Sequence, residues 1–336
     1  MRAPEKLAMR DAFAEAVVEA LAEHPNLIVL DADVSKSTKS AVFAKAHPER
    51  FLNVGIAEQN MMSIAAGMAA AGMLPVVNTF AMLLTMRALD QLRQSVAYPQ
   101  LNVKIMGHYA GLSAGPEGPT HHAIEDLGIV RSVPNLTILV PCDASEAKAS
   151  FHAALAHQGP VYLRLCRNPV PAVLDAPRPF TIGAGYELHP GHDVTIIGIG
   201  VMVARALDAA EHLTGQGISA RVVAMPSLKP IDRGLIEKAA RETGAVVTAE
   251  EHNIYGGLGS AVAEVLGATC PVPMEQVGIA DCFAESGEYF EIMDKYGLGV
   301  SDIVAACHRV LERKHLGYAP TARRWRGHCR ARSAEV

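Results

Sequence analysis

Short apolar runs recur along the chain, and most are followed by segments with helical spacing. Such runs are typical of strands buried on both faces of a parallel sheet. In the first half they lie at residues 27–30, 74–80, 102–107, 136–140 and 161–165, and in the second half at residues 194–197, 220–223 and 245–248. This alternation predicts the α/β class, with two mostly parallel, doubly wound sheets.

A proline-rich stretch predicts the boundary between two domains. Five prolines lie between Arg167 and Gly191. Because proline disfavours regular structure, we expect a linker there. The predicted plan is a first domain over residues 1–175, a linker over 176–191, a second domain over 192–314 and a basic tail over 315–336.

Composition excludes several classes of protein. A net charge of −5 argues against nucleic acid as the main partner. We expect neither a signal peptide nor a membrane span, because charged residues interrupt every long apolar run. The six cysteines show no Cys-x-x-Cys spacing, so we expect reduced thiols, a cytoplasmic location and no metal cluster.

Glu58 is the first candidate catalytic residue. It follows an apolar run that ends at Gly55 and precedes a small-residue segment, so we expect it in the first turn of a helix over residues 58–72. The helix dipole favours its charged form by roughly 0.3–1 kcal/mol. Burial disfavours the charge, and in a dry site the carboxyl group would carry a proton as a general acid/base. The alternative is a solvated glutamate that satisfies the helix amides.

Polar residues also follow other strands, where open α/β sheets bind ligands. Asp31 and Asp33 end the first predicted strand, and a polar loop over residues 35–38 comes next. That loop is equally consistent with helix capping. The loop over residues 108–122 is rich in Gly and Pro and presents His and Glu, so it is a further site candidate.

The second domain contains one motif of uncertain meaning. Glu250-Glu251-His252 precedes a Gly-rich turn over residues 256–260. Such a turn between a strand and a helix can bind phosphate, but without a full dinucleotide fingerprint the evidence is weak.

Three motifs together resemble one enzyme family. They are Gly55-Ile56-Ala57-Glu58-Gln59-Asn60, then Asn78-Thr79-Phe80, then Gly115-Pro116-Glu117-Gly118-Pro119-Thr120-His121. This set resembles the transketolase family over its pyrimidine-binding and C-terminal domains, which is nearly the whole chain. The family's N-terminal domain, which binds the cofactor diphosphate and Mg²⁺, has no counterpart in this sequence.

The resemblance implies thiamine diphosphate as cofactor. Glu58 matches the glutamate that bonds N1′ of the aminopyrimidine, and Phe80 matches the aromatic residue that stacks on that ring, although Phe80 taken alone would be a core residue. Asp33 matches an aspartate close to the cofactor. Leu83 and Met86 stand where standard transketolases have aromatic residues near the pyrimidine. No metal ligand is expected on this chain, because the Mg²⁺ ligands would come from a partner subunit.

The resemblance also implies a substrate site. Arg10, Ser37 and Arg167 match residues that bind a substrate phosphate, and His121 matches a histidine that lines the substrate channel, which we take as catalytic. Tyr109 replaces a common histidine, and Glu117 stands where an aspartate reads a substrate hydroxyl. The cofactor pocket therefore looks largely kept and the substrate pocket altered.

These matches predict the small subunit of a split transketolase, which transfers a two-carbon ketol unit between sugars, phosphorylated ones being favoured. Its expected partner is an N-terminal subunit in an α2β2 assembly, with no nucleic acid or membrane partner. Two alternatives stay open. One is the β subunit of a 2-oxoacid dehydrogenase, which the Gly-Pro-Thr-His loop disfavours; the other is a catalytically silent scaffold.

Overall fold

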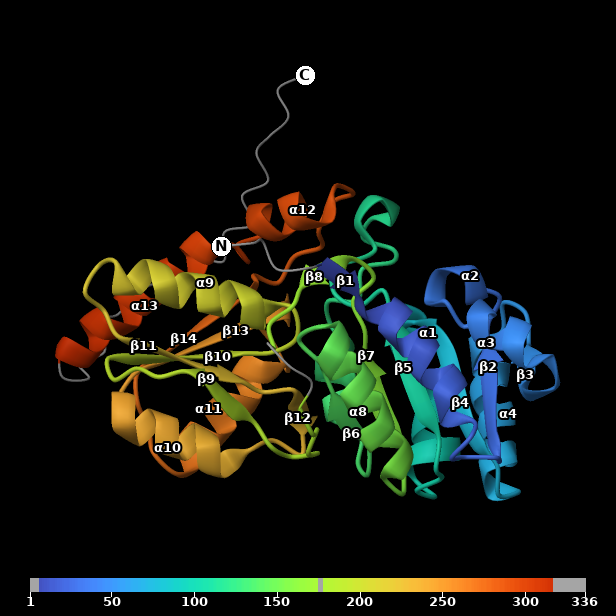
Figure 1. Ribbon diagram of the computed structural model, residues 1–336. Coiled ribbons are helices and arrows are strands. Elements are labelled where there is room, and N and C mark those ends of the chain that lie inside the picture. Colours follow the sequence, from blue (N-terminus) through green and yellow to red (C-terminus); the bar gives the residue numbers. More distant parts are fainter. Residues whose placement is uncertain (1–5, 175–177, 317–336) are drawn as a thin grey trace.

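The computed structural model describes residues 6–174 and 178–316. They form two sheets side by side, each covered by helices on both faces (Figure 1). This arrangement confirms the predicted α/β class. Nearly all of the expected basic tail lies outside the described residues. In the part of the chain that is described, no helix has both the length and the apolar character to cross a membrane.

The first sheet has seven strands in the order β12-β6-β7-β5-β4-β2-β3. Its strands are β2 (Leu27–Asp31), β3 (Phe51–Asn53), β4 (Leu74–Phe80), β5 (Lys104–His108), β6 (Thr137–Leu139), β7 (Val161–Arg164) and β12 (Ser227–Lys229). All neighbours are parallel except β12, which is antiparallel to β6. Every residue of β4 and β5 is buried, including the polar residues Asn78, Thr79, Lys104 and His108, so both faces of these central strands are covered.

Helices of this domain lie on both faces of that sheet (Figure 1). They are α1 (Met9–Ala20), α2 (Ser35–Thr38), α3 (Ala41–Ala46), α4 (Glu58–Ala70), α5 (Ala81–Met86), α6 (Leu89–Gln91), α7 (Asp126–Arg131) and α8 (Ala144–Ala156). Short helical turns lie at Pro48–Arg50, Leu92–Ala97 and Gly115–Glu117. The Asp143 carboxylate caps α8 by accepting from the Glu146 amide at 2.9 Å, as its sequence position suggests.

The second sheet has five strands in the order β14-β13-β10-β11-β9. Its strands are β9 (Tyr186–His189), β10 (Val194–Gly198), β11 (Ala220–Ala224), β13 (Val246–Asn253) and β14 (Met274–Ile279). Its helices are α9 (Met202–Thr214), α10 (Arg233–Thr243), α11 (Leu258–Ala268), α12 (Tyr289–Lys295) and α13 (Val300–His315). The linker predicted over residues 176–191 is too long, since β9 lies inside it and pairs with β11.

Two strand pairings tie distant parts of the chain together. β12 comes from the second half of the sequence but extends the first sheet by pairing with β6. β1 (Lys6–Ala8) forms a two-stranded ribbon with β8 (Pro169–Pro171). The two halves are therefore interlocked, which a boundary drawn from proline content alone could not indicate.

Each sheet has one point where the strand order reverses. In the first sheet this point lies between β2 and β4, because β3 was added on one side and β4 on the other. In the second sheet it lies between β10 and β13. The crevice at the carboxyl ends of such strand pairs is where open α/β sheets bind ligands.

Candidate active site

Glu58 begins helix α4, as predicted, at the carboxyl end of the first sheet. Its side chain is only 3% exposed, so the alternative of a solvated glutamate is wrong. Nη1 of Arg87 donates to both carboxylate oxygens at 3.2 Å. The Arg87 side chain is itself 54% exposed. A buried carboxylate is thus held by an arginine that reaches in from the surface, a partner that the sequence did not single out.

Phe80 is the last residue of β4, a strand against which α4 packs. It forms a small apolar cluster with Leu83, Tyr109 and Ala114. The Phe80 ring stacks on Tyr109, with centroids 4.3 Å apart and planes 29° apart. Leu83 is buried in this cluster, whereas Met86 is 43% exposed and lies outside it. Of the two residues predicted to stand near the pyrimidine, only Leu83 contributes to the apolar cluster.

Arg10, Tyr109 and Arg167 converge although they are far apart in sequence. Nη1 of Arg10 lies 3.3 Å from the Tyr109 hydroxyl, and the Arg167 guanidinium carbon lies 4.9 Å from the centroid of the Tyr109 ring. The backbone of Tyr109 has a φ of 57°, a left-handed conformation that residues other than glycine rarely adopt. Two guanidinium groups therefore flank one phenol ring, an arrangement suited to an anionic group.

Ser37 meets this cluster through its backbone. Its carbonyl oxygen accepts from Nη1 of Arg10 at 3.0 Å. The residues around it, predicted as a polar loop, form the short helix α2. Ser37 thereby orients Arg10.

The 108–122 loop brings two more predicted residues to the same place. Glu117 is exposed, and its Oε1 lies 4.0 Å from Nη1 of Arg167. The His121 ring lies edge-on to Phe80 at 6.1 Å, and its Nδ1 is 3.0 Å from the Thr120 hydroxyl. The predicted substrate residues of this loop thus lie near both the arginines and the apolar cluster.

The two aspartates after β2 have different surroundings. Asp31 is fully buried and accepts from the Val34 amide and the hydroxyls of Thr38 and Ser40. Burial raises the pKa of the Asp31 carboxyl. Asp33 is exposed, has a φ of 66°, and exchanges two 3.1 Å hydrogen bonds with Asn53. Asp31 therefore stabilises the turn, and of the two only Asp33 has an exposed side chain.

His108 was not predicted as a site residue, although it ends a buried strand beside Tyr109. Its Nε2 lies 3.1 Å from Oδ1 of Asn78. The Asn78 amide nitrogen donates to two backbone oxygens, so Oδ1 is the acceptor and His108 the donor. Burial lowers the pKa of His108 to about 3, with a smaller contribution from Arg10. The imidazole is therefore neutral next to the arginine cluster.

These residues fit the aminopyrimidine of a thiamine cofactor. One buried carboxylate supplies the polar contact that a ring nitrogen needs, and Phe80 and Leu83 supply an apolar surface. Within residues 6–174 and 178–316, no group of three or more His, Cys, Asp or Glu side chains is arranged so that it could hold a metal ion.

The Gly-rich turn of the second domain holds a carboxylate of its own chain. Glu250 Oε2 accepts from the Leu258 amide at 2.7 Å, and Oε1 accepts from the Gly259 amide at 2.8 Å. A Cβ at Gly257 would lie 2.0 Å from Oε2, so glycine is required there. Because both helix amides are taken by Glu250, this turn does not present them to a phosphate, for which the sequence provides only weak evidence.

Comparison with known proteins agrees with this geometry. Residues 5–172 match the model for the transketolase pyrimidine-binding domain, and residues 183–303 match that for the transketolase C-terminal domain. The chain belongs to the transketolase family. The second match begins at residue 183, which also supports a shorter linker than we predicted.

The similar proteins include separate subunits of comparable length. A 6-deoxy-6-sulfo-D-fructose transketolase subunit from a Clostridium species is 43% identical over 91% of this chain and 95% of its own length. One subunit of an apulose-4-phosphate transketolase from Phocaeicola vulgatus is 37% identical, covering 91% and 97%. A solved split-gene transketolase, described as an inactive β4 tetramer, is 50% identical with a TM-score of 0.86 and covers 92% and 99%.

This transketolase-family chain is therefore the small subunit of a thiamine diphosphate-dependent, transketolase-like transferase. Relatives of this kind favour the transketolase branch over the 2-oxoacid dehydrogenase β subunit.

Proposed function

We propose that this chain forms the pyrimidine-binding half of a two-subunit active site that transfers a two-carbon ketol unit between anionic sugars. The observation that carries the proposal is Glu58, a carboxylate 3% exposed at the start of α4, the helix that packs against the strand ending in Phe80. Thiamine diphosphate supplies the carbanion chemistry when bound, so the protein has to supply orientation and proton handling.

Glu58 would hold a proton at N1′ of the aminopyrimidine. Its present partner does not prevent this, because an ionised carboxylate has about four acceptor positions and Arg87 uses only part of them. Arg87 is also half-exposed, so moving it aside costs little. Phe80 would stack on the ring, and Leu83 would contact its edge. Asp33 would face the cofactor from the end of β2, and Met86 would lie at the rim.

Arg10 and Arg167 would bind a terminal oxyanion of the sugar, with the Tyr109 hydroxyl as a neutral donor. Two relatives are named for sugars with such a group, one a sulfonate and the other a phosphate. Glu117 and His121 would contact the sugar hydroxyls nearer to the reacting carbons.

A partner subunit would bring the diphosphate site and the Mg²⁺ ligands, giving an α2β2 enzyme in the cytoplasm. The outer face of α4 supports a subunit contact, because its exposed positions are small or uncharged: Gln59, Asn60, Ser63, Gly67 and Ala70. Small side chains allow a second helix to approach closely. The solved relative described as inactive contains β chains only, which is consistent with a chain that needs its partner.

Reconstitution tests the proposal. The purified chain should show no ketol transfer alone and should gain it on addition of an N-terminal transketolase subunit, thiamine diphosphate and Mg²⁺. Activity of the isolated chain would contradict the split site. A stable complex without ketol transfer would favour the scaffold alternative, and decarboxylation of a 2-oxoacid would favour the dehydrogenase alternative.

A further inference from the structure

The Glu250-Glu251-His252 motif lies at the end of β13, on the side of the second sheet that faces the first domain. All three side chains are buried. Glu250 stays within its own domain, where it caps α11. Glu251 and His252 reach across: the Leu112 amide donates to Glu251 Oε1 at 2.7 Å, and the Gly128 amide donates to His252 Nε2 at 3.2 Å.

The Glu251 contact falls at the base of the 108–122 loop. That base is closed by Gly111 and Ala123, which exchange two backbone hydrogen bonds of 3.0 and 2.9 Å. Gly111 has a φ of 60°, and a Cβ there would lie 2.3 Å from the Glu251 carboxyl carbon. The carboxylate is therefore packed directly against the backbone of the loop, and only glycine permits this approach.

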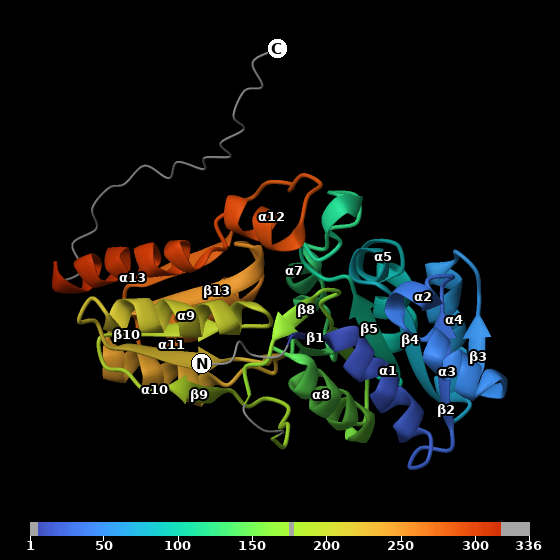
Figure 2. The same ribbon diagram turned by 45° about the horizontal axis from the view of Figure 1, so that its top comes forward.

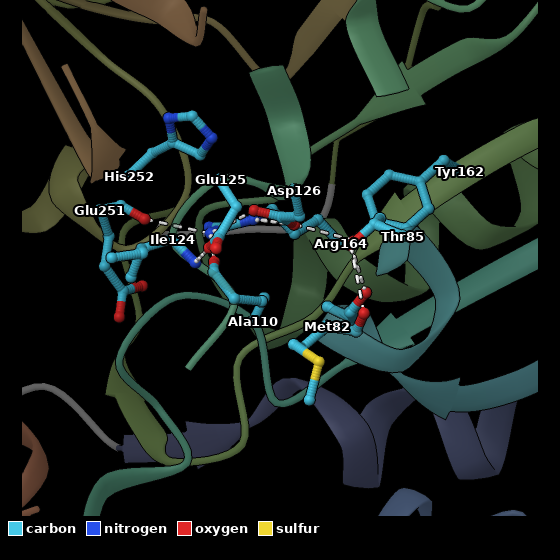
Figure 3. Close-up of polar contacts among 12 residues, drawn as sticks. Met82, Thr85, Ala110, Ile124, Glu125, Asp126, Tyr162, Arg164, Glu251 and His252 are labelled. Carbon is cyan, nitrogen blue, oxygen red and sulfur yellow. Dashed lines mark hydrogen bonds and ion pairs between the residues drawn. The ribbon is translucent and has the colours of Figure 1, made fainter. Parts of the chain in front are cut away.

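Arg164 joins the same base to β13 (Figure 3). Its Nη2 donates to the backbone oxygens of Ala123 and Glu251, both at 3.0 Å. It also forms two bonds with Asp126, of 2.8 and 3.1 Å. Because the backbone oxygen of Glu251 is held by Arg164, its carboxylate has a fixed direction toward Leu112.

The far end of the loop also meets the second domain. The Gly287 amide lies 3.4 Å from the Gly115 oxygen, and a Cβ at Gly118 would lie 2.4 Å from the Ser286 hydroxyl. These residues precede α12, which lies next to the loop (Figure 2). The second domain thus contacts the loop at two places, near its base at Leu112 and further along at Gly115 and Gly118. The candidate active site lies in the other domain.

Tyr109 shows why this support matters. It stands two residues before Gly111, and its left-handed backbone is unfavourable for a tyrosine. Such a conformation persists only where the surrounding contacts impose it. A small movement of the base would therefore shift Tyr109 away from Arg10 and Arg167.

We propose that Glu251 is a positioning residue for substrate binding, which fixes the 108–122 loop from the opposite domain through the Leu112 amide. The proposal rests on the substrate roles proposed above for Tyr109, Glu117 and His121. It gives the C-terminal domain a role in catalysis without any contact to substrate or cofactor.

Hydrogen–deuterium exchange on the full chain tests the contact itself. Glu251→Ala should raise the exchange rate of the Leu112 amide and the 108–122 loop by about tenfold or more, while the α4 amides keep their rate. Glu251→Gln retains an acceptor oxygen and should recover most of the protection. Glu250→Ala is the matched control, because it removes an equally buried carboxylate that does not touch the loop.

Kinetics of the reconstituted complex test the consequence. Glu251→Ala should raise KM for the anionic ketose by about tenfold or more, because displacing substrate-binding groups by about an ångström has effects of this size or larger. The affinity for thiamine diphosphate should not change, and Glu250→Ala should leave KM as it is. Should Glu251→Ala fail to fold, Glu251→Gln and Gly111→Ala are measured instead, and Gly111→Ala should show the loosened loop and the raised KM.

Three results would overturn the proposal: unchanged exchange of the loop in Glu251→Ala, a loosened loop with unchanged KM, or an equal rise of KM in Glu250→Ala. If the wild-type complex shows no ketol transfer, the proposed function fails instead. The exchange measurement then still decides whether Glu251 holds the loop.

Discussion

Glu58 and Glu251 are equally buried carboxylates at the carboxyl ends of the two sheets, yet their partners differ. Each is 3% exposed. Glu58 is paired with the surface-reaching Arg87, whereas Glu251 accepts from the Leu112 amide and shares a buried cluster with Tyr289 and Arg164. The partner of the first carboxylate can move into solvent, whereas the second cannot lose its partners without opening the fold.

The same contrast holds for the two sites as wholes. Beyond the strands of the first sheet, the side chains of Asp33 and Glu117 are exposed. Arg10 and Arg167 flank the Tyr109 ring there. In the second sheet, Glu250 occupies the helix amides where an anion could bind, and Glu251 is packed against the first domain. A crevice at the ends of parallel strands can therefore bind a ligand only where side chains of the protein itself do not fill it.

Replacing Glu58 should have the largest effect. Glu58→Gln keeps the shape but cannot relay a proton, so turnover of the reconstituted enzyme should fall by about 10²–10⁴-fold. Exchange of the C2 proton of bound thiamine diphosphate, followed by NMR, should slow in parallel. Glu19→Gln is the control, since Glu19 is an exposed carboxylate paired with Lys148, and it should change neither rate. An unchanged C2 exchange rate in Glu58→Gln would remove Glu58 from the proton-handling role.

Replacing Glu251 should change how the free energy of unfolding depends on pH. Burial raises its pKa to about 7, so the folded chain binds more protons than the unfolded chain between pH 4.5 and 7. Its contribution to the free energy of unfolding is therefore complete below that window and declines as pH rises, by up to about 1.4 kcal/mol per pH unit. Denaturant unfolding of wild type and Glu251→Gln across this range measures the difference.

The difference in stability between the two proteins should shrink as pH rises from 4.5 to 7, because glutamine does not titrate. Other titratable groups close to Glu251 are Arg164, Asp126, Tyr289 and Cys166. Because both proteins contain these groups, their contributions to the difference in stability cancel to first order. A difference independent of pH would mean that Glu251 is ionised in both states.

Arg167 tests whether the open site binds an anion. Arg167→Ala should raise KM for an anionic ketose by the equivalent of roughly 1.5–3 kcal/mol, the usual value of charge-assisted hydrogen bonds, and should leave an uncharged analogue nearly unaffected. Arg241→Ala serves as control, because Arg241 is an exposed arginine paired with Glu237. Equal weakening of both sugars would make Arg167 a structural residue.

Glu117→Asp should have the smallest effect. Shortening the side chain by one methylene draws its carboxylate away from the site and from Arg167, so we expect an altered preference among acceptor aldehydes with unchanged thiamine diphosphate affinity. Competition between two acceptors that differ in hydroxyl configuration measures this preference. No change in the ratio would place Glu117 outside the substrate site.

The repeated α/β order, the start of α4 at Glu58 and the position of Phe80 at a strand end could be predicted from the sequence. These features depend on local periodicity and on short motifs, which neighbouring residues encode directly. The error at the linker was also local in origin, because the proline content hid β9.

The contacts between groups far apart in the sequence could not be predicted in this way. Arg87 pairs with Glu58 across 29 positions, Arg10 meets Tyr109 across 99, and Glu251 meets Leu112 across 139. No periodicity encodes such pairs, because each depends on how sheets and domains pack. The same packing determined that one buried carboxylate is paired with a half-exposed arginine while the other supports the 108–122 loop.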